Sequence, residues 1–440
     1  MLFLTSHLLI WTFIPTFTNI NLPLDTIEAL AWGSDLKWGF NKHPPFSAFA
    51  VEVFFKLFGN QDWAFYLLSQ IFVVSAFFII FLLAKEFFRE NNLALYSVLF
   101  LESIIFYNFT TPEFNVNVSQ LPFWALSIFL TWRCLKHDKI IDYIFLGIVF
   151  GLGILSKYLF IYLIFGVKCL FIFKLFYKKK FKNFNFLIVA PITLIIITPH
   201  LMWLFENNFL TLTYGLQRAS GSENISDHFI LPITFIFKQL GILIPFFIMG
   251  FFLIKKLKIK KNFMDEKTIF LFFTSIFPIL LIILTSIILG AKIRTMWMTP
   301  FYLVFGILLV EIYKNNINKD NIKKFYFAFV VIFFLSPLSY LIVSLSNDFK
   351  RTDYPGKEIS RLVQNKWDDN FTNEIKIVIG DEWSAGNLSY HLYSRPIWLN
   401  DLKNNLSNIT EDQGVIYTGN PKILKKICPG VFGSINPVGY

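Results

Sequence analysis

Residues 25–45, DTIEALAWGSDLKWGFNKHPP, form a polar and charged stretch between two very apolar ones. The stretch holds two carboxylates near its start and a Lys-His pair followed by Pro-Pro at its end. Apolar segments of about 20 residues cross a bilayer as helices. We therefore interpret residues 25–45 as part of an extramembrane loop that the following helices hold at one face of a membrane. We predict that this loop carries half of an active site.

Composition indicates an integral membrane protein. The 440 residues are 55% hydrophobic and only 16% charged, whereas soluble domains carry about a quarter charged residues. The net charge of +11 would suit nucleic-acid binding, but the basic residues cluster between hydrophobic spans, as loops that set membrane topology do. The three cysteines, at 134, 169 and 428, are far apart and show no metal or redox spacing.

Eleven transmembrane helices are predicted. We expect residues 1–18 to be the first and to be retained, because they lack the basic start and the cleavage site of a signal peptide. Residues 45–58 are too short and too charged for a span and suit an interfacial helix. The other ten predicted spans are 63–85, 92–110, 118–135, 140–156, 157–177, 185–205, 229–254, 268–290, 300–313 and 324–346.

The distribution of Lys and Arg predicts the orientation. Basic residues are concentrated in the segments 85–91, 133–139, 174–182, 255–267 and 314–324. Loops rich in Lys and Arg face the cytoplasm. The opening loop, the turn at 111–117, the loop at 206–228, the segment 292–297 and the C-terminal tail would then share the outer face.

Two domains are expected: a membrane domain over 1–346, with a catalytic first outer loop at 19–62, and a small α/β extramembrane domain over 347–440. The second part has more Asp, Asn, Lys, Ser and Gly and no long apolar run. Residues 374–380 and 414–417 are predicted strands, because apolar β-formers there are bounded by turn residues.

Three carboxylates are candidates for acid–base chemistry. Asp25 and Glu28 are three residues apart and would share one face of a helix. Asp25 could cap that helix or act as a general base toward a hydroxyl. Glu113 lies in a short outer turn, where Thr111 would cap the next helix and Pro112 would stand in its first turn. Glu113 is the natural second carboxylate beside Asp25, although stabilisation of a helix N-terminus would also explain it.

Basic residues on the outer side suit an anion. Lys42 and His43 precede Pro44-Pro45, which would hold them at the mouth of the next helix, and such a pair suits a phosphate. The alternative for Lys42 is a side chain that reaches the headgroup level. Lys157, Lys292 and Arg294 are further phosphate-binding candidates. We expect His200 to be structural, and no metal-ligand motif is present.

The order of several motifs resembles family 39 of the glycosyltransferases, the relatives of dolichyl-phosphate-mannose protein mannosyltransferases and of the lipid A aminoarabinose transferase. The motifs are Leu22–Asp25 with Trp32-Gly33 and Trp38–Pro45, Pro112–Asn115, Gly151–Tyr158, Thr198–Trp203 and Lys292–Trp297. The resemblance implies a GT-C fold, a polyprenyl-phosphate sugar donor and inversion at the anomeric carbon. It maps the catalytic acid onto Asp25, the second acid onto Glu113, where Asp is usual in the family, and the basic residue before Pro onto His43. Whether Glu28 replaces the acid that often follows the catalytic Asp stays open.

The leading hypothesis is thus a glycosyltransferase on the periplasmic face of a bacterial inner membrane. It would move a sugar to lipid A, another envelope glycan or a protein, with Asp25 as the acceptor-activating base. No cofactor is assigned, and a divalent cation stays open. The alternative is a transporter or flippase for a lipid-linked saccharide. Transporters place ionisable groups at mid-membrane and show repeated halves, whereas here the charges gather at one rim and no repeat is seen.

Overall fold

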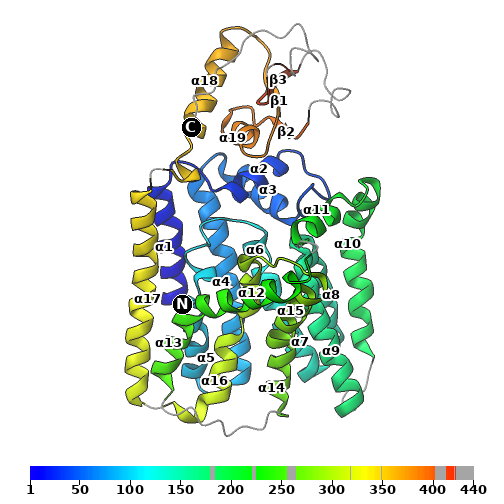
Figure 1. Cartoon of the computed structure of the whole chain (residues 1–440), viewed down its shortest axis with the longest axis vertical. Helices are drawn as coiled ribbons and strands as arrows, with labels where there is room; N and C mark the ends of the chain where they lie inside the picture. The colour runs from blue at the N-terminus through cyan, green and yellow to red at the C-terminus, as the bar shows by residue number, and fades with distance from the viewer. Residues whose placement is uncertain are drawn as a thin grey trace.

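A helical bundle makes up most of the computed structural model, and a small α/β part stands on one end of it (Figure 1). The structure describes residues 1–178, 184–220, 224–254, 264–317, 319–347, 349–401, 413–420 and 422. The basic segments predicted at 174–182 and 255–267 lie partly outside the described residues, as does the end of the tail.

Each predicted span falls on helical structure. The bundle helices are α1 (Leu2–Thr18), α4 (Asp62–Phe87), α5 (Asn91–Leu99), α7 (Leu121–His137), α8 (Ile140–Ser156), α9 (Ile161–Lys178), α10 (Val189–Glu206), α12 (Asp227–Ile242), α13 (Ile244–Leu253), α14 (Glu266–Leu271), α15 (Phe277–Leu289), α16 (Phe305–Tyr313) and α17 (Lys319–Ser346). Shorter helices are α2 (Leu24–Gly33) and α3 (Phe46–Phe58) at the rim (Figure 1), α6 (Val116–Ser119) below them, and α11 (Leu210–Ala219).

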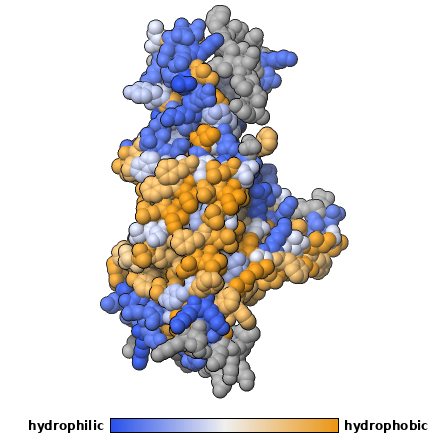
Figure 2. Space-filling model, turned by 90° about the vertical axis from the view of Figure 1, so that its left-hand side faces the viewer, coloured by the Kyte–Doolittle hydropathy of each residue, from blue (hydrophilic) through white to orange (hydrophobic). Residues whose placement is uncertain are grey.

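On the face that Figure 2 shows, an apolar belt crosses the bundle between polar ends, and the coloured surface of the α/β part above it is largely hydrophilic. Among the described residues, five helices are long and apolar enough to cross a membrane, and seven if two bent pairs each count as one span. The pairs are α12 with α13, bent by 49°, and 295–302 with 305–316, bent by 52°. The structure therefore supports a multi-span membrane protein, while the number eleven stays a prediction.

The opening loop folds into two short helices on the rim, where α2 packs on α3. The predicted helix at 45–58 is present as α3, which begins after Pro45. Asp25 is not a cap: it lies in the first turn of α2, after Pro23. Proline has no N–H and a fixed φ, so it starts a helix readily.

The cap predicted at Thr111 is also wrong. The helix after the turn starts later, at Val116, and its cap is Asn115, whose side chain accepts hydrogen bonds from the amides of Asn117 and Val118. Asn is as good an N-cap as Thr or better, and the turn that holds Glu113 is therefore longer than expected.

The C-terminal part contains a three-stranded parallel sheet of order β2-β1-β3, built from β1 (Ile375–Ile379), β2 (Ile397–Leu399) and β3 (Gly414–Tyr417). Strands β1 and β3 confirm the two predicted strands, and β2 was not predicted. Helices α18 (Gly356–Asp368) and α19 (Ser384–His391) pack beside the sheet, and α19 also lies on α2.

Arg395 connects the C-terminal part to helices α2 and α3. Its guanidinium donates to the carbonyl of Leu30 on α2 at 2.6 Å and to the carboxylate of Glu52 on α3 at 3.1 Å. The guanidinium also lies over the ring of Phe55, 4.3 Å from its centroid. The side chains of Arg395 and Glu52 are only 14% and 10% exposed. A single side chain thus links β2's preceding turn to both helices of the opening loop.

Replacement of Arg395 by Ala should destabilise the protein by about 3 kcal/mol, because it leaves the carboxylate of Glu52 buried without its partner. Thermal unfolding of the detergent-solubilised protein would show a clear fall in Tm. The control is Lys37→Ala, which removes a solvent-exposed pair with Asp35 and should cost well under 1 kcal/mol. Equal Tm values for the two variants would contradict the assigned role of Arg395.

Candidate functional site

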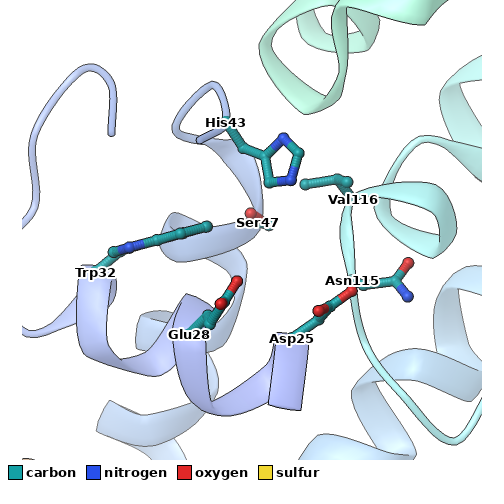
Figure 3. A pocket seen from close by; sticks show the side chains of 7 residues that line it. All are labelled: Asp25, Glu28, Trp32, His43, Ser47, Asn115 and Val116. Carbon is teal, nitrogen blue, oxygen red and sulfur yellow. The ribbon is translucent and has the colours of Figure 1, made fainter. Parts of the chain in front are cut away.

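A pocket opens at the rim between α2, α3 and the turn before α6 (Figure 3). The hollow is shallow: its empty volume of about 220 Å³ includes the solvent space in front of it. Its lining residues are Asp25, Glu28, Trp32, His43, Ser47, Asn115 and Val116. The pocket therefore brings together the two ends of the opening loop, which are about twenty residues apart in sequence, with the turn that follows Glu113.

Asp25 and Glu113 form a close pair of acids. The backbone amide of Asp25 donates a hydrogen bond to Oε1 of Glu113 at 3.0 Å. Burial, followed by the charge of Asp25, raises the pKa of Glu113 to about 8. Burial also raises the pKa of Asp25, although the charges of Lys157 and Lys42 oppose the shift. Because its pKa is about 8, Glu113 keeps most of its proton at neutral pH, and the charges of Lys157 and Lys42 favour the ionised form of Asp25.

Glu28 belongs to a second charged group that reaches into the C-terminal part. Nζ of Lys42 lies 2.6 Å from Glu28 and 3.2 Å from Glu382, and Asn41 also donates to Glu382, at 3.0 Å. Burial raises the pKa of Glu28 despite its hydrogen bond with Lys42. Burial would lower the pKa of Lys42, but the two carboxylates outweigh burial, so its pKa is raised. Lys42 is thus a charged group that already has two partners.

His43 lies at the top of the pocket, between the rings of Trp32 and Tyr214, at centroid distances of 6.0 and 6.5 Å. Burial, together with the charges of Lys157 and Lys42, lowers its pKa to about 3. His43 is therefore neutral at physiological pH. It can donate or accept one hydrogen bond, but it does not supply the positive charge that we expected from a Lys-His pair.

Two cations face the pocket from other elements. Lys157 stands at the break between α8 and the next helical segment, where it hydrogen-bonds to the side chain of Asn117 and lies 5.4 Å from the ring centroid of Trp297. Burial lowers the pKa of Lys157 to about 7, in part offset by Asp25. Arg218, on α11, lies over Tyr214 at 5.6 Å, and its charge acts on both Asp25 and His43.

The structure unites some of the predicted residues and separates others. Asp25, Glu28 and His43 line the pocket, Glu113 bonds to Asp25, and Lys42 and Lys157 are neighbours of the lining. Lys292 and Arg294 are not among the described lining residues. The amide of Lys292 bonds to the carbonyl of Ala219, so their segment abuts the end of α11 instead.

His200 has a structural partner, as expected, because Nδ1 lies 2.5 Å from the carbonyl of Trp38. Sequence reasoning missed the residues Ser47, Asn115, Asn117, Arg218 and Glu382. The two Asn side chains stand in the quoted Pro-Glu-Phe-Asn motif and its continuation, so a signal for them existed. No local pattern marks Glu382, which is far from the loop in sequence.

Comparison with known proteins gives a consistent result. Residues 42–203 match the family model for dolichyl-phosphate-mannose-protein mannosyltransferase. The chain is 24% identical over 211 residues to the lipopolysaccharide core galacturonosyltransferase RgtB of Rhizobium johnstonii. That match covers 48% of this chain and 42% of the relative.

Two solved structures share the fold. They are ArnT from Cupriavidus metallidurans bound to undecaprenyl phosphate, with a TM-score of 0.64 and 13% identity, and the same protein in the apo state, with 0.62 and 11%. Both alignments cover 98% of this chain and 94% of the other. The likeness includes the C-terminal part, which the family model does not reach.

The pKa of Glu113 predicts a pH dependence of stability. A folded-state pKa of about 8, against an ordinary 4.5, means that the folded protein binds this proton more tightly than the unfolded chain. Raising the pH from about 4.5 to about 8 should therefore lower the free energy of unfolding. In Glu113→Gln this contribution is absent, so Tm should fall less steeply across that range. Parallel Tm curves for the two proteins would contradict the shift.

Proposed function

We propose that the chain is a membrane glycosyltransferase of the GT-C type, which transfers a sugar from a polyprenyl-phosphate donor to an acceptor, with inversion; the partial family match, the relative RgtB and the shared fold support this proposal. The observation that carries the proposal is the pair of acids at the pocket, in which Asp25 lines the pocket and its backbone amide bonds to Glu113. Such a pair, at the edge of an apolar belt, suits a donor that is itself anchored in the membrane.

Asp25 is the base in this proposal. It accepts the proton of the acceptor hydroxyl as the oxygen attacks the anomeric carbon, and the bond from that carbon to the phosphate breaks on the opposite side. Glu113 is a positioning residue, since its Oε1 accepts the backbone amide of Asp25. Glu28 is held by Lys42, so we assign it to binding rather than to proton transfer.

Lys157 and Arg218 form the phosphate end. Cations that face the leaving phosphate stabilise the charge it gains in the transition state. Lys157 has a pKa of about 7, so an arriving phosphate would raise that value and complete its protonation. His43 adds a hydrogen bond without charge. Lys292 and Arg294 are assigned to the lipid headgroup region beside the end of α11.

We also infer the donor lipid and the location of the pocket. One fold neighbour was solved with undecaprenyl phosphate, which supports a polyprenyl phosphate here. The distribution of Lys and Arg in the sequence supports a pocket on the periplasmic side of a bacterial inner membrane. The acceptor is lipid A, another envelope glycan or a protein.

The position of the charged groups favours an enzyme over a transporter. Helices α2 and α3, which supply most of the pocket lining, lie at the rim beneath the C-terminal part (Figure 1), whereas transporters bind near the midplane of the bilayer. A buried pair between His7 and Glu102, at 2.8 Å, does lie within the bundle, but neither residue belongs to the described pocket lining.

Asp25→Asn should lower sugar transfer about 100-fold to 10,000-fold, because it removes the base and keeps the shape. Transfer is measured in membranes by mass spectrometry of lipid A and envelope glycans, with and without the variant. Binding of undecaprenyl phosphate to the purified variant should persist. Asp35→Asn, at an exposed ion pair, is the control and should retain activity. Unchanged sugar transfer by Asp25→Asn would show that Asp25 is not the base.

Arg218→Gln should weaken the binding of undecaprenyl phosphate about tenfold, because a charge-assisted contact contributes about 1.5 kcal/mol or more. The effect should diminish at high salt. The control for overall charge is Arg361→Gln, because Arg361 is an exposed residue of α18. If both variants bind like the parent protein, Arg218 does not belong to the phosphate end.

A further inference from the structure

One side of the pocket has no part in the proposed proton transfer. Glu28, Trp32 and Ser47 lie on this side, and Asp25 and Asn115 lie opposite (Figure 3). The Trp32 ring stacks on Phe40, with centroids 5.4 Å apart and an interplanar angle of 14°. This side therefore combines a rigid aromatic ring, a hydroxyl and a carboxylate, which is the usual lining of a site for a small polar ligand.

The hydroxyl of Ser47 is buried without a partner. Ser47 is 1% exposed, and its Oγ forms no hydrogen bond with any described residue. The indole Nε1 of Trp32, which is 2% exposed, is in the same condition within the described part of the chain. A buried polar group that stays unpaired costs about 1–3 kcal/mol. Ser47 lines the pocket, so a ligand hydroxyl that enters there can supply the missing bond.

The charges of the pocket differ between its two sides. Next to Trp32, one ammonium group, that of Lys42, is shared by the carboxylates of Glu28 and Glu382, which leaves an excess of negative charge. The cations Lys157 and Arg218 act on Asp25 and His43 instead. A donor would therefore turn its phosphate toward Lys157 and Arg218 and its sugar toward Trp32.

We propose that Glu28, Trp32 and Ser47 form the subsite for the sugar ring of the donor, and that this subsite takes a sugar without a carboxylate. The inference rests on the proposed function and deepens it. A uronic acid would place a third carboxylate beside Glu28 and Glu382, which already share one cation. A neutral sugar meets Glu28 as a hydrogen-bond acceptor and Ser47 as a donor, with its apolar face against Trp32.

Three lipids test the proposal on the purified full-length protein in nanodiscs: undecaprenyl phosphate, the same lipid carrying glucose and the same lipid carrying galacturonic acid. The parent protein should bind the glucosyl lipid about tenfold more tightly than the galacturonosyl lipid. Ser47→Ala and Trp32→Phe should each lower the affinity for the glucosyl lipid about threefold to tenfold, because each removes one hydrogen bond. Both variants should bind undecaprenyl phosphate as the parent does.

The chain offers matched controls. Ser127 and Trp132, both on α7, are likewise buried and have side-chain donors without a described partner, but they do not line the pocket. Ser127→Ala and Trp132→Phe should therefore bind all three lipids like the parent protein. If these control variants lose as much affinity for the glucosyl lipid as the pocket variants do, the proposed subsite is wrong.

The negative charge beside Trp32 can be changed by a single variant. Glu382→Gln keeps the hydrogen-bonding shape toward Lys42 and Asn41 but removes one negative charge. It should narrow the preference for glucose over galacturonic acid about threefold or more. If the parent protein binds the galacturonosyl lipid more tightly than the glucosyl lipid, the proposal that the subsite takes a sugar without a carboxylate is wrong.

Two further outcomes distinguish failure of the sugar subsite from failure of the proposed function. Equal loss of undecaprenyl phosphate binding in the Ser47 and Trp32 variants would assign this side of the pocket to the phosphate, and the subsite would be wrong. If the parent protein binds none of the three lipids, the proposed function itself fails.

Discussion

The hydrogen bond from the amide of Asp25 to the carboxyl group of Glu113 is the contact on which the pocket depends. The first amides of a helix have no partner within the helix, so α2 begins where a side chain from another segment satisfies one of them. The bond therefore fixes the start of α2 against the turn before α6. It also holds two acids close together with limited access to water, where only one of them ionises readily.

The rest of the fold supplies the support that this arrangement requires. Helices α2 and α3 are short and lie on the rim, and short helices are marginal without tertiary packing. The C-terminal part provides that packing through α19 and through Arg395, which bonds to both helices. Glu382 comes from the same part and reaches Lys42. The support thus also alters the charge of the site.

The sequence predicted the helices well, because apolar runs bounded by charged segments have few other structures in a membrane protein. Asp25 and His43 were predicted to belong together, and the pocket unites them. The helix starts at Pro23 and Asn115 were missed, because several good capping residues stand side by side. Glu382 and Ser47 could not be found, since their roles arise from tertiary contacts that leave no local pattern. The phosphate-binding role expected for Lys292 and Arg294 stays a prediction, since topology fixes a face but not a distance.

The contact between Lys42 and Glu382 crosses a boundary that sequence comparison also marks. The family match ends at residue 203, while one carboxylate that acts on the pocket comes from the far end of the chain. The part that holds Lys42 and the part that holds Glu382 can therefore diverge at different rates. Exchange of C-terminal parts between relatives would change the charge beside Lys42 and leave the bond between Asp25 and Glu113 intact.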